Sequence, residues 1–372
     1  MSTQRTHGGA VHGPVESALA HARVAGPVVV ALVLVLLVGE LALQVRAQIR
    51  YGQSIFNLVA GKPSYVYNEQ LKLKTLRPSA VIKGEKAVIE TNQLGLRGAD
   101  FDPTNADGEK RMAILGASTV MGTFASQNAN TSSERLQALL REANHNPSLR
   151  VINAGIVGLT IEQQVELLRG WVLNWGVKTV LWYPGTNDIG CRAPSASQRQ
   201  PPLRIPFPSM PQSILTSDLI VMNTSVLRKS HAPSNQSLVP SFDPDKLHKS
   251  IAEGIRIARE AQMNLIVVTS ATNYRSSLPA DELARRAATA VFFRPCYTPT
   301  ELAATVDKFN DELRAVAAEQ QVPVIDAAQL VPPDLALFGD ANHFSDHGEG
   351  VFAALLAKEL LDRKLLGGAA LP

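Results

Sequence analysis

Residues 111–122 read RMAILGASTVMG, in which a short, mainly apolar run leads directly into a turn that contains Gly116 and Gly122. A run of this length that ends at a glycine is typical of a buried strand, and we expect a helix to follow it. Ser118 then lies at a strand-to-helix junction, where its side chain is exposed at the carboxyl edge of a sheet. Taken alone, Ser118 can equally be a residue that caps the following helix, so its interpretation depends on the rest of the chain.

The alternation of strand and helix continues towards the C-terminus. Four further apolar runs predict strands: RVINA (150–154), TVLWY (179–183), NLIVVTS (264–270) and VPVID (322–326). Helical periodicity after capping residues predicts helices over 132–143, 160–174, 244–262, 299–319 and 346–362. Parallel strands need such crossover helices, so we expect an α/β domain with one five-stranded parallel sheet. Helices cover both of its faces in a three-layer α/β/α sandwich, and ligands bind beyond the carboxyl ends of the strands.

One segment near the N-terminus differs from the rest of the chain. Residues 24–45 read VAGPVVVALVLVLLVGELALQV and carry a single charge, Glu40. About 20 apolar residues suffice to cross a bilayer, so we expect one N-terminal transmembrane helix that acts as a signal anchor. A buried core helix and a cleaved signal peptide are the alternatives, the latter because small residues stand at Val45 and Ala47.

The charges around this segment lean slightly against export of the C-terminal part. Arg5 and Arg23 precede the apolar run, whereas Arg46, Arg50 and Lys62 follow it. Long domains cross a membrane largely regardless of local charge. We therefore expect a single-pass protein of the inner or plasma membrane with its catalytic domain on the extracytoplasmic, periplasmic side.

These patterns divide the chain into an N-terminal tail (1–23), a membrane span (24–45), a stalk (46–110), the α/β domain (111–363) and a C-terminal tail (364–372). We expect the stalk to pack onto the domain from Thr91 onward. Residues 191–243 contain eight prolines and no long period, which predicts an insertion over the domain surface. Long loops of this kind are often lids.

Composition excludes several classes of protein. The chain has 36 Lys+Arg against 33 Asp+Glu, and a formal charge of +3 does not mark a nucleic-acid binder. With 45% hydrophobic and 19% charged residues the chain is a folded globular protein rather than a disordered one. Two cysteines exclude a disulfide-stapled miniprotein and leave no CxxC pair for a structural zinc site.

Two further strand ends carry groups that complement Ser118. The second strand runs into NAGIVG with Gly155, and the third runs into GTNDIG with Asn187. The N–H groups of Ser118 and Gly155 and the amide of Asn187 could together hold a tetrahedral oxyanion. Gly155 can instead be a turn glycine with positive φ, and Asn187 can form an Asx turn beside Asp188.

The stretch GDANHFSDHGEG (339–350) precedes the last predicted helix. Its Asp340 and His343 are three residues apart, which lets the carboxylate reach Nδ1 of the imidazole while Nε2 faces Ser118. His343 and His347 are four residues apart and could share a metal on one helical face. We favour the first interpretation, because no HExxH pattern and no other ligand cluster accompanies the two histidines.

Ser after strand one, Gly after strand two, GxND after strand three and DxxH before the last helix resemble, in that order, the four blocks of the SGNH (GDSL-type) hydrolase superfamily. The match covers about residues 91–361. The resemblance implies a flavodoxin-like sheet and esterase activity without a metal or an organic cofactor. It implies Ser118 as nucleophile, His343 as base and Asp340 as its orienting group, with an oxyanion hole from Ser118, Gly155 and Asn187.

Two features qualify the resemblance. The usual GDS of the first block reads GAS here, with Ala117 in place of an Asp that is no triad member, so loop packing or substrate preference is affected rather than activity. The stretch NQLGLRG (92–98) resembles a feature of membrane-anchored members, which often accompany surface-polysaccharide pathways.

The two cysteines fall at the same edge of the predicted sheet. Cys191 follows the GTND loop and Cys296 follows the fourth strand. In an oxidising compartment a disulfide between them could pin the insertion. Two buried thiols are the alternative, and neither has a His or Asp partner in sequence that would make it a nucleophile.

The favoured hypothesis is a membrane-anchored serine esterase that removes small O-acyl groups, above all acetyl, from a glycan through an acyl-Ser118 intermediate. An O-acyltransferase that acylates a polysaccharide hydroxyl would use the same residues. A lipid esterase is a further alternative, because the anchor holds the site near a bilayer and the insertion contains SILTSDLIVM (213–222). The non-enzyme alternative is an anchored polysaccharide-binding or assembly protein, which has no chemical need for an Asp/His pair.

Overall fold

The computed structural model describes residues 14–51, 64–83, 87–192 and 238–366. A single helix, α1 (Pro14–Tyr51), is the described part of one compact unit, and all other described residues belong to a second unit, the domain. The middle of the predicted insertion, 193–237, lies outside the described residues, as do 1–13 and 367–372.

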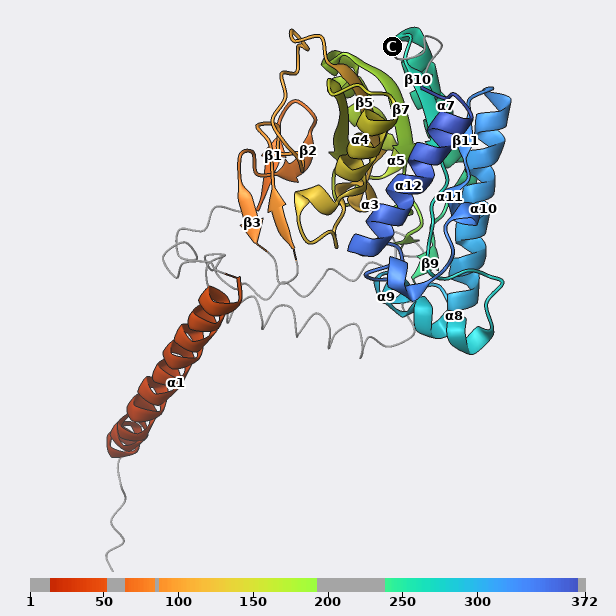
Figure 1. The fold of residues 1–372 in the computed structure, drawn as a ribbon. Coiled ribbons are helices and arrows are strands. Elements are labelled where there is room, and N and C mark those ends of the chain that lie inside the picture. Colours follow the sequence, from red (N-terminus) through yellow and green to blue (C-terminus); the bar gives the residue numbers. More distant parts are fainter. Residues whose placement is uncertain (1–13, 52–63, 84–86, 193–237, 367–372) are drawn as a thin grey trace, which may run out of the picture. The chain divides into compact units, whose positions relative to one another are not determined.

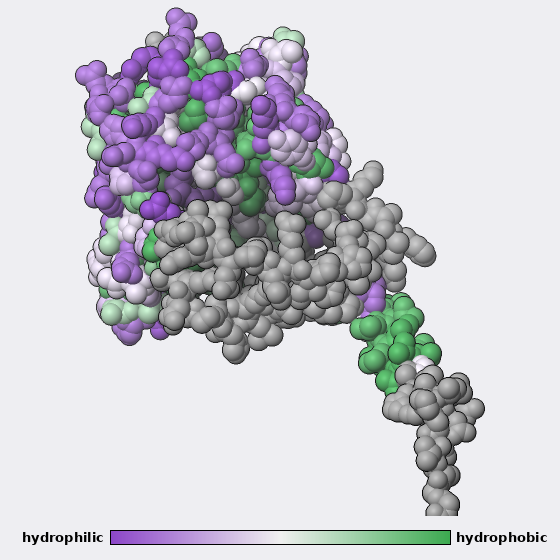
Figure 2. Space-filling model, turned by 180° about the vertical axis from the view of Figure 1, so that it is seen from behind, coloured by the Kyte–Doolittle hydropathy of each residue, from purple (hydrophilic) through white to green (hydrophobic). Residues whose placement is uncertain are grey.

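Helix α1 contains the apolar segment found in the sequence. Its stretch Gly26–Val45 has a mean hydropathy of 2.7 and is long and apolar enough to cross a membrane. Figure 2 shows this stretch as continuously hydrophobic surface, and the side chains of Val28 and Val38 are 52% and 67% exposed. A helix that is apolar on every face suits lipid, although an N-terminal signal sequence has the same length and composition.

The domain is built on one five-stranded parallel sheet in the order β6-β5-β7-β10-β11. Its strands are β5 (Lys110–Gly116), β6 (Leu149–Gly155), β7 (Val177–Tyr183), β10 (Asn264–Val268) and β11 (Val324–Ile325). Counted along the chain this order is 2-1-3-4-5, which is that of flavodoxin-like sheets. The predicted number of strands, their direction and the α/β/α class are therefore confirmed.

Helices cover both faces of the sheet, as the sequence predicted (Figure 1). One face carries α4 (Ser132–Ala143) and α12 (Asp346–Asp362), which lie side by side; the other carries α5 (Ile161–Gly170), α7 (Pro244–Glu260) and α10 (Pro299–Glu319). Successive side chains of a strand point to opposite faces of the sheet and so pack into two different core clusters. In β7, for example, Leu181 packs into one cluster and its neighbour Trp182 into the other. The predicted helix to residue 174 ends earlier, and a 3-10 turn, η2 (Val172–Trp175), follows it.

Two antiparallel hairpins precede the sheet and were not predicted. They pair β1 (Tyr65–Asn68) with β2 (Leu73–Leu76), and β3 (Val81–Lys83) with β4 (Val88–Glu90). Leu71 and Leu73 already lie in the core of the domain, so the expectation that packing begins at Thr91 is wrong. Strands of three or four residues are too short to leave a period in the sequence.

Several short elements complete the domain. They are α3 (Ser118–Met121), η1 (Asn128–Asn130), α8 (Ala280–Arg286), α9 (Ala288–Phe293), α11 (Ala327–Leu330) and η4 (Leu335–Leu337). At the ends of the predicted insertion, β8 (Cys191–Arg192) pairs with β9 (Val239–Pro240) in an antiparallel ribbon. This ribbon holds Arg192 and Val239 beside each other.

Candidate active site

Ser118 is the first residue of α3, two residues beyond Gly116, the last residue of β5. The turn is tight: a Cβ on Gly116 would lie 2.2 Å from the carbonyl oxygen of Tyr183, so only glycine fits there. The carbonyl of Ser118 accepts hydrogen bonds from the N–H groups of Gly122 (3.1 Å) and Thr123 (3.3 Å). Gly122 ends the short helix in the left-handed region, with φ of 75°. The backbone of this turn therefore places Ser118 at the carboxyl edge of the sheet.

His343 joins Ser118 to Asp340. Its Nε2 lies 2.8 Å from Oγ of Ser118, and its Nδ1 lies 2.8 Å from Oδ2 and 3.0 Å from Oδ1 of Asp340. The three residues predicted as nucleophile, base and orienting group are thus brought together in one hydrogen-bonded line. Such a line can transfer a proton from a hydroxyl to an imidazole and stabilise the imidazolium that forms.

The carboxylate of Asp340 is held in its charged form. Burial raises its pKa, but hydrogen bonds from the His343 ring and from the backbone N–H groups of Asn342 and His343 outweigh this effect, so the pKa of Asp340 is lowered. The two backbone bonds, to Oδ1, measure 2.9 and 2.8 Å. Because backbone N–H groups of its own turn fix the Asp340 carboxylate, this carboxylate holds the His343 ring in one orientation.

Asn187 lies in the loop after β7, where other side chains hold the backbone. Its Nδ2 donates to the carbonyl of Leu159 at 3.0 Å. Asp188 accepts the N–H of Ile161 at the start of α5 (3.0 Å), and burial raises the pKa of this carboxyl to about 6. Arg294 donates to the carbonyls of Ile189 (2.6 Å) and Thr186 (2.8 Å) from the opposite side. One N–H of the Asn187 amide thus fixes the loop, and the second has no acceptor among the residues that the structure describes.

Gly155 is the one predicted site residue that the structure does not bring to Ser118 in the predicted role. Its N–H donates to Oδ1 of Asn153 at 3.1 Å, and a Cβ at this position would lie 2.2 Å from the backbone nitrogen of Met121. The prediction of Gly155 as an oxyanion donor is therefore corrected: this glycine allows α3 to pack closely on β6. The exposed Gly158, with φ of 80°, directly precedes the residue that bonds to Asn187 and is the better candidate.

A cleft of about 350 Å³ opens beside the histidine. It is lined by Asn187, Ile189, Gly190, Thr289, Ala290, Phe293, Arg294, Asp340, Asn342 and His343. Most of the side chains that reach it are polar, and one aromatic ring, Phe293, is 68% exposed. Its volume falls within the range of small-molecule sites, roughly 300 to 1,000 Å³.

Cys191 and Cys296 form a disulfide with their Cα atoms 5.8 Å apart. The bond joins β8 to the segment that follows α9, across 105 residues of sequence. Both half-cystines adjoin the loops that line the cleft, since Gly190 precedes Cys191 and Arg294 lies two residues before Cys296. The disulfide and the β8/β9 ribbon therefore both hold the part of the cleft next to Gly190.

His347, the alternative partner for His343, is exposed on the first turn of α12. Both ring nitrogens of His343 are engaged, one by Ser118 and one by Asp340. Neither nitrogen is left to share a metal with His347. Among the residues that the structure describes, no group of three or more His, Cys, Asp or Glu side chains could hold a metal ion.

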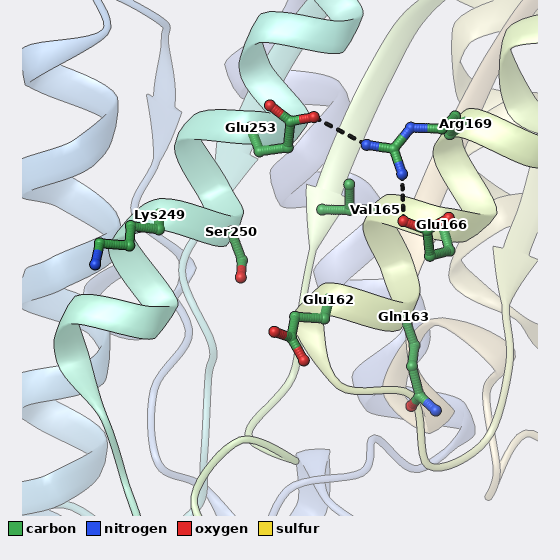
Figure 3. Close-up of a pocket in the computed structure, with 8 residues that line it drawn as sticks. All are labelled: Glu162, Gln163, Val165, Glu166, Arg169, Lys249, Ser250 and Glu253. Atoms are coloured by element: carbon green, nitrogen blue, oxygen red, sulfur yellow. Dashed lines mark hydrogen bonds and ion pairs between the residues drawn. The ribbon is translucent and has the colours of Figure 1, made fainter.

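A second hollow, of about 360 Å³, lies between α5 and α7 (Figure 3). Most of its charged side chains are paired: Arg169 joins Glu166 and Glu253, the latter at 2.9 Å, and Lys246 nearby joins Glu162 at 2.8 Å. Exposed pairs of this kind are a solvated surface feature. This hollow is therefore not a candidate active site.

Comparison with known proteins gives one family match and several similar structures. A family model for GDSL-like lipases and acylhydrolases matches residues 114–351. A lipase/acylhydrolase from Enterococcus faecalis is similar in structure, with 16% identity over 68% of this chain and 96% of that chain and a TM-score of 0.43. An acetylxylan esterase from Geobacillus stearothermophilus has 16% identity over 71% and 97%, with a TM-score of 0.42. A search of curated proteins found no match.

Proposed function

The chain belongs to the GDSL-like lipase/acylhydrolase family, and from this membership we propose that it hydrolyses O-acyl esters with Ser118 as the nucleophile. The observation that carries the proposal is the line of hydrogen bonds from Asp340 through His343 to Oγ of Ser118. An unactivated serine hydroxyl is a weak nucleophile, and an adjacent, oriented base is what activates it.

The reaction follows from these contacts. His343 Nε2 accepts the Ser118 proton while Oγ attacks the ester carbonyl, and Asp340 stabilises the charged imidazole. Collapse of the tetrahedral intermediate breaks the bond to the alcohol, which leaves with the proton from His343. Water, activated by the same histidine, then releases the acid from the acyl-Ser118 intermediate.

Three donors at the edge of the sheet suit the oxyanion of that intermediate. They are the Ser118 N–H, the N–H of the Asn187 amide that does not bond to Leu159, and the Gly158 N–H, which takes the role first predicted for Gly155. The N–H groups of Ser118 and Gly158 have no acceptor within the described part of the chain. Donors that are held in place before the reaction stabilise developing charge without reorganisation.

We further propose that the substrate is a small acyl group, acetyl above all, carried by a glycan. The cleft supports this choice, because polar side chains such as Asn187, Asn342 and Thr289 line it together with the exposed ring of Phe293. A sugar presents hydroxyl groups to polar side chains and an apolar C–H face to an aromatic ring. A lipid chain would instead need a continuous apolar lining.

We propose that α1 anchors the protein in the membrane and that the domain lies on the extracytoplasmic side. The apolar stretch of α1 has 20 residues, which is long enough to cross a bilayer and supports the anchor. The Cys191–Cys296 disulfide supports the location, because disulfides persist in an oxidising compartment. Protease added to intact spheroplasts should remove the domain and leave a short membrane-bound fragment. Full protection until the membrane is lysed would refute this orientation, and release of the untreated chain as a soluble protein would refute the anchor.

The activity is tested with the full chain in detergent micelles, wild type beside Ser118→Ala. Substrates are 4-nitrophenyl acetate, a longer-chain 4-nitrophenyl ester and an acetylated oligosaccharide. We expect turnover by wild type and a loss of about 10⁴-fold or more in the Ser118 variant. Ser276→Ala, which removes a hydroxyl bonded to Asp307 on the surface, is the matched control and should retain full activity.

Each negative result points to another function. Preference for the longer ester would indicate a lipid substrate. Folded but inert wild type would refute the esterase. Repeating the assay with an acyl donor and a sugar acceptor would then separate an acyltransferase from a polysaccharide-binding protein.

A further inference from the structure

Arg97 is a charged side chain that the catalytic steps do not use, yet it is only 1% exposed. Its guanidinium donates to the backbone carbonyls of Val88 (3.1 Å), Ala125 (2.9 Å), Gly122 and Met121, and Nε donates to Oδ1 of Asn128 (2.9 Å). Four of these five acceptors lie between residues 121 and 128, in the loop that follows the nucleophile helix. A buried guanidinium with this many partners holds that loop in one geometry.

The turn NQLGLRG (92–98) is built to deliver this side chain. Oδ1 of Asn92 accepts the N–H groups of Leu94 and Leu96, both at 3.0 Å. Gly95 has φ of 77°, and a Cβ there would lie 2.2 Å from the carbonyl oxygen of Leu76. Leu96 is buried in the core, and Arg97 forms a β-bridge with Thr91. Asn92, Gly95 and Arg97 of this turn thus act together to place the guanidinium against the loop at residues 121–128.

The loop that Arg97 holds touches both ends of the Ser118–His343 hydrogen bond. At one end, Gly122 and Thr123 donate to the carbonyl of Ser118. At the other end, the Phe124 ring packs against the His343 ring, with centroids 5.9 Å apart. Ser126 N–H also donates to Oδ1 of Asp346, three residues after His343, at 2.7 Å. A shift of this loop would therefore change the distance between nucleophile and base.

The guanidinium stays charged in this setting. Burial lowers the pKa of Arg97 to about 10, and the carboxylates of Glu349 and Asp346 oppose that effect. At neutral pH the side chain is protonated, so every bond to a loop carbonyl is charge-assisted.

We propose that Arg97 is a positioning residue for catalysis, which fixes the loop at residues 121–128 so that Oγ of Ser118 and Nε2 of His343 stay within hydrogen-bond reach. This inference rests on the proposed function, because it assigns a role at the same site. It also gives the segment before the family match a part in the chemistry, since Arg97 lies outside residues 114–351.

The test compares Arg97→Met and Arg97→Lys with wild type, as full chains in detergent micelles at a temperature well below unfolding. Misplacing reacting groups by about 1 Å costs on the order of 100-fold, so we expect Arg97→Met to lower kcat by about 10- to 100-fold with KM within about twofold. Arg97→Lys keeps the positive charge but loses the planar guanidinium with its several donors. Its kcat should therefore lie between those of wild type and Arg97→Met.

Arg111→Met is the matched control. Arg111 is also buried, at 3% exposure, and donates to the carbonyls of Asp102 and Trp175 at the opposite end of β5. We expect this variant to lower the melting temperature as Arg97→Met does, while kcat stays within about twofold of wild type. Equal loss of kcat in both variants, in proportion to their loss of stability, would make Arg97 a merely structural residue and overturn the proposal.

A second readout separates failure of this inference from failure of the proposed function. A fluorophosphonate phosphonylates an activated serine: the Ser118 oxygen bonds to phosphorus, fluoride leaves, and His343 accepts the proton. We expect labelling that is absent in Ser118→Ala and is slowed about 10- to 100-fold in Arg97→Met. If wild type is labelled and Arg97→Met reacts as fast, the positioning role is wrong while the esterase stands. If wild type neither reacts nor hydrolyses esters, both are wrong. Should Arg97→Met not fold, the Arg97→Lys rate decides, and a rate equal to wild type refutes the role.

Discussion

Nε2 of His343 lies 2.8 Å from Oγ of Ser118, although the two residues are 225 positions apart in the chain. Neither residue has a catalytic character by itself. The fold brings them together, because Ser118 follows the end of β5 and the loop before α12 carries His343 to the same edge of the sheet. The predictions below concern what holds this contact and what surrounds it.

Replacing Asp340 by Asn should nearly abolish turnover. The amide keeps the shape but can donate to Nδ1, which favours the tautomer that cannot accept the Ser118 proton, so we expect kcat to fall by about 10³- to 10⁴-fold. Steady-state kinetics on 4-nitrophenyl acetate measures this. Asp362→Asn, at an exposed ion pair with Lys358, is the control and should have no effect. Retention of more than a tenth of kcat by Asp340→Asn would argue against its orienting role.

Removing the Asn187 amide should cost about 10²- to 10³-fold in kcat with little change in KM, because the oxyanion exists only after attack. The variant is Asn187→Ala. Asn342→Ala, which changes another amide in the same cleft, should affect KM more than kcat. An Asn187→Ala variant that raises KM alone would indicate a role in binding the substrate instead.

Gly155, which ends β6, and Gly158, which follows the strand, should respond differently to alanine. Gly155→Ala forces a Cβ to within 2.2 Å of the Met121 nitrogen, so we expect a loss of about 1 to 3 kcal/mol or more in stability. At Gly158 no atom lies within 4 Å, and the cost is the left-handed backbone alone, roughly 1 to 2 kcal/mol. Thermal unfolding ranks the two variants, and kcat should fall in Gly158→Ala. A Gly155→Ala variant as stable as wild type would contradict the close packing of α3 on β6.

The buried carboxyl of Glu349 should make stability depend on pH. Burial raises its pKa from 4.5 to about 7, and hydrogen bonding to Ser132 with the charges of Arg97 and Arg135 only partly offsets this. Between these pH values the folded protein therefore holds a proton that the unfolded chain has lost. Wild type should lose stability relative to Glu349→Gln as pH rises through this window, by about 1.4 kcal/mol per pH unit, and the difference should be constant outside it.

Melting temperatures of both proteins from pH 4 to 8 test this prediction. The exposed Glu260→Gln variant, which alters a surface pair with Arg256, should follow wild type at every pH. Parallel curves for wild type and Glu349→Gln would contradict the buried ionisation.

Reduction of the Cys191–Cys296 bond should lower the melting temperature. Closing a loop of 105 residues limits the unfolded chain, worth up to about 4 to 5 kcal/mol in the chain-entropy model, so we expect a fall of several degrees, up to about 10 °C. Cys191→Ala, Cys296→Ala and the double variant should all match the reduced protein. Alkylation of two thiols in native protein without reductant would contradict the bond.

The sheet and its main helices could be predicted because each is long enough to carry a period and begins at a recognisable cap. Thr298 and Glu301 cap each other at the start of α10, and Ser345 caps α12. The hairpins before the sheet and the helices α8 and α9 were not predicted. These elements are short, and packing against the rest of the domain stabilises them more than any local sequence pattern does.

The site was predictable where a motif ends a strand, and less so where two similar residues compete. Ser118, Asn187, Asp340 and His343 each stand at the edge that the topology implies. Gly155 and Gly158 share one turn, and only the hydrogen bond to Asn153 and the positive φ of Gly158 distinguish them. The role of Arg97 could not be derived from its motif, because its partners come from a loop more than 20 residues away.

The β8/β9 ribbon and the disulfide have an evolutionary consequence. Cys191 pairs with Pro240, Arg192 pairs with Val239, and Cys191 is also bonded to Cys296, so the described residues on either side of 193–237 are held beside each other. Doubling the length of a loop closed in this way costs only about 0.6 kcal/mol. A change in the length of the chain between β8 and β9 should therefore cost little stability, so we expect relatives to differ in length there.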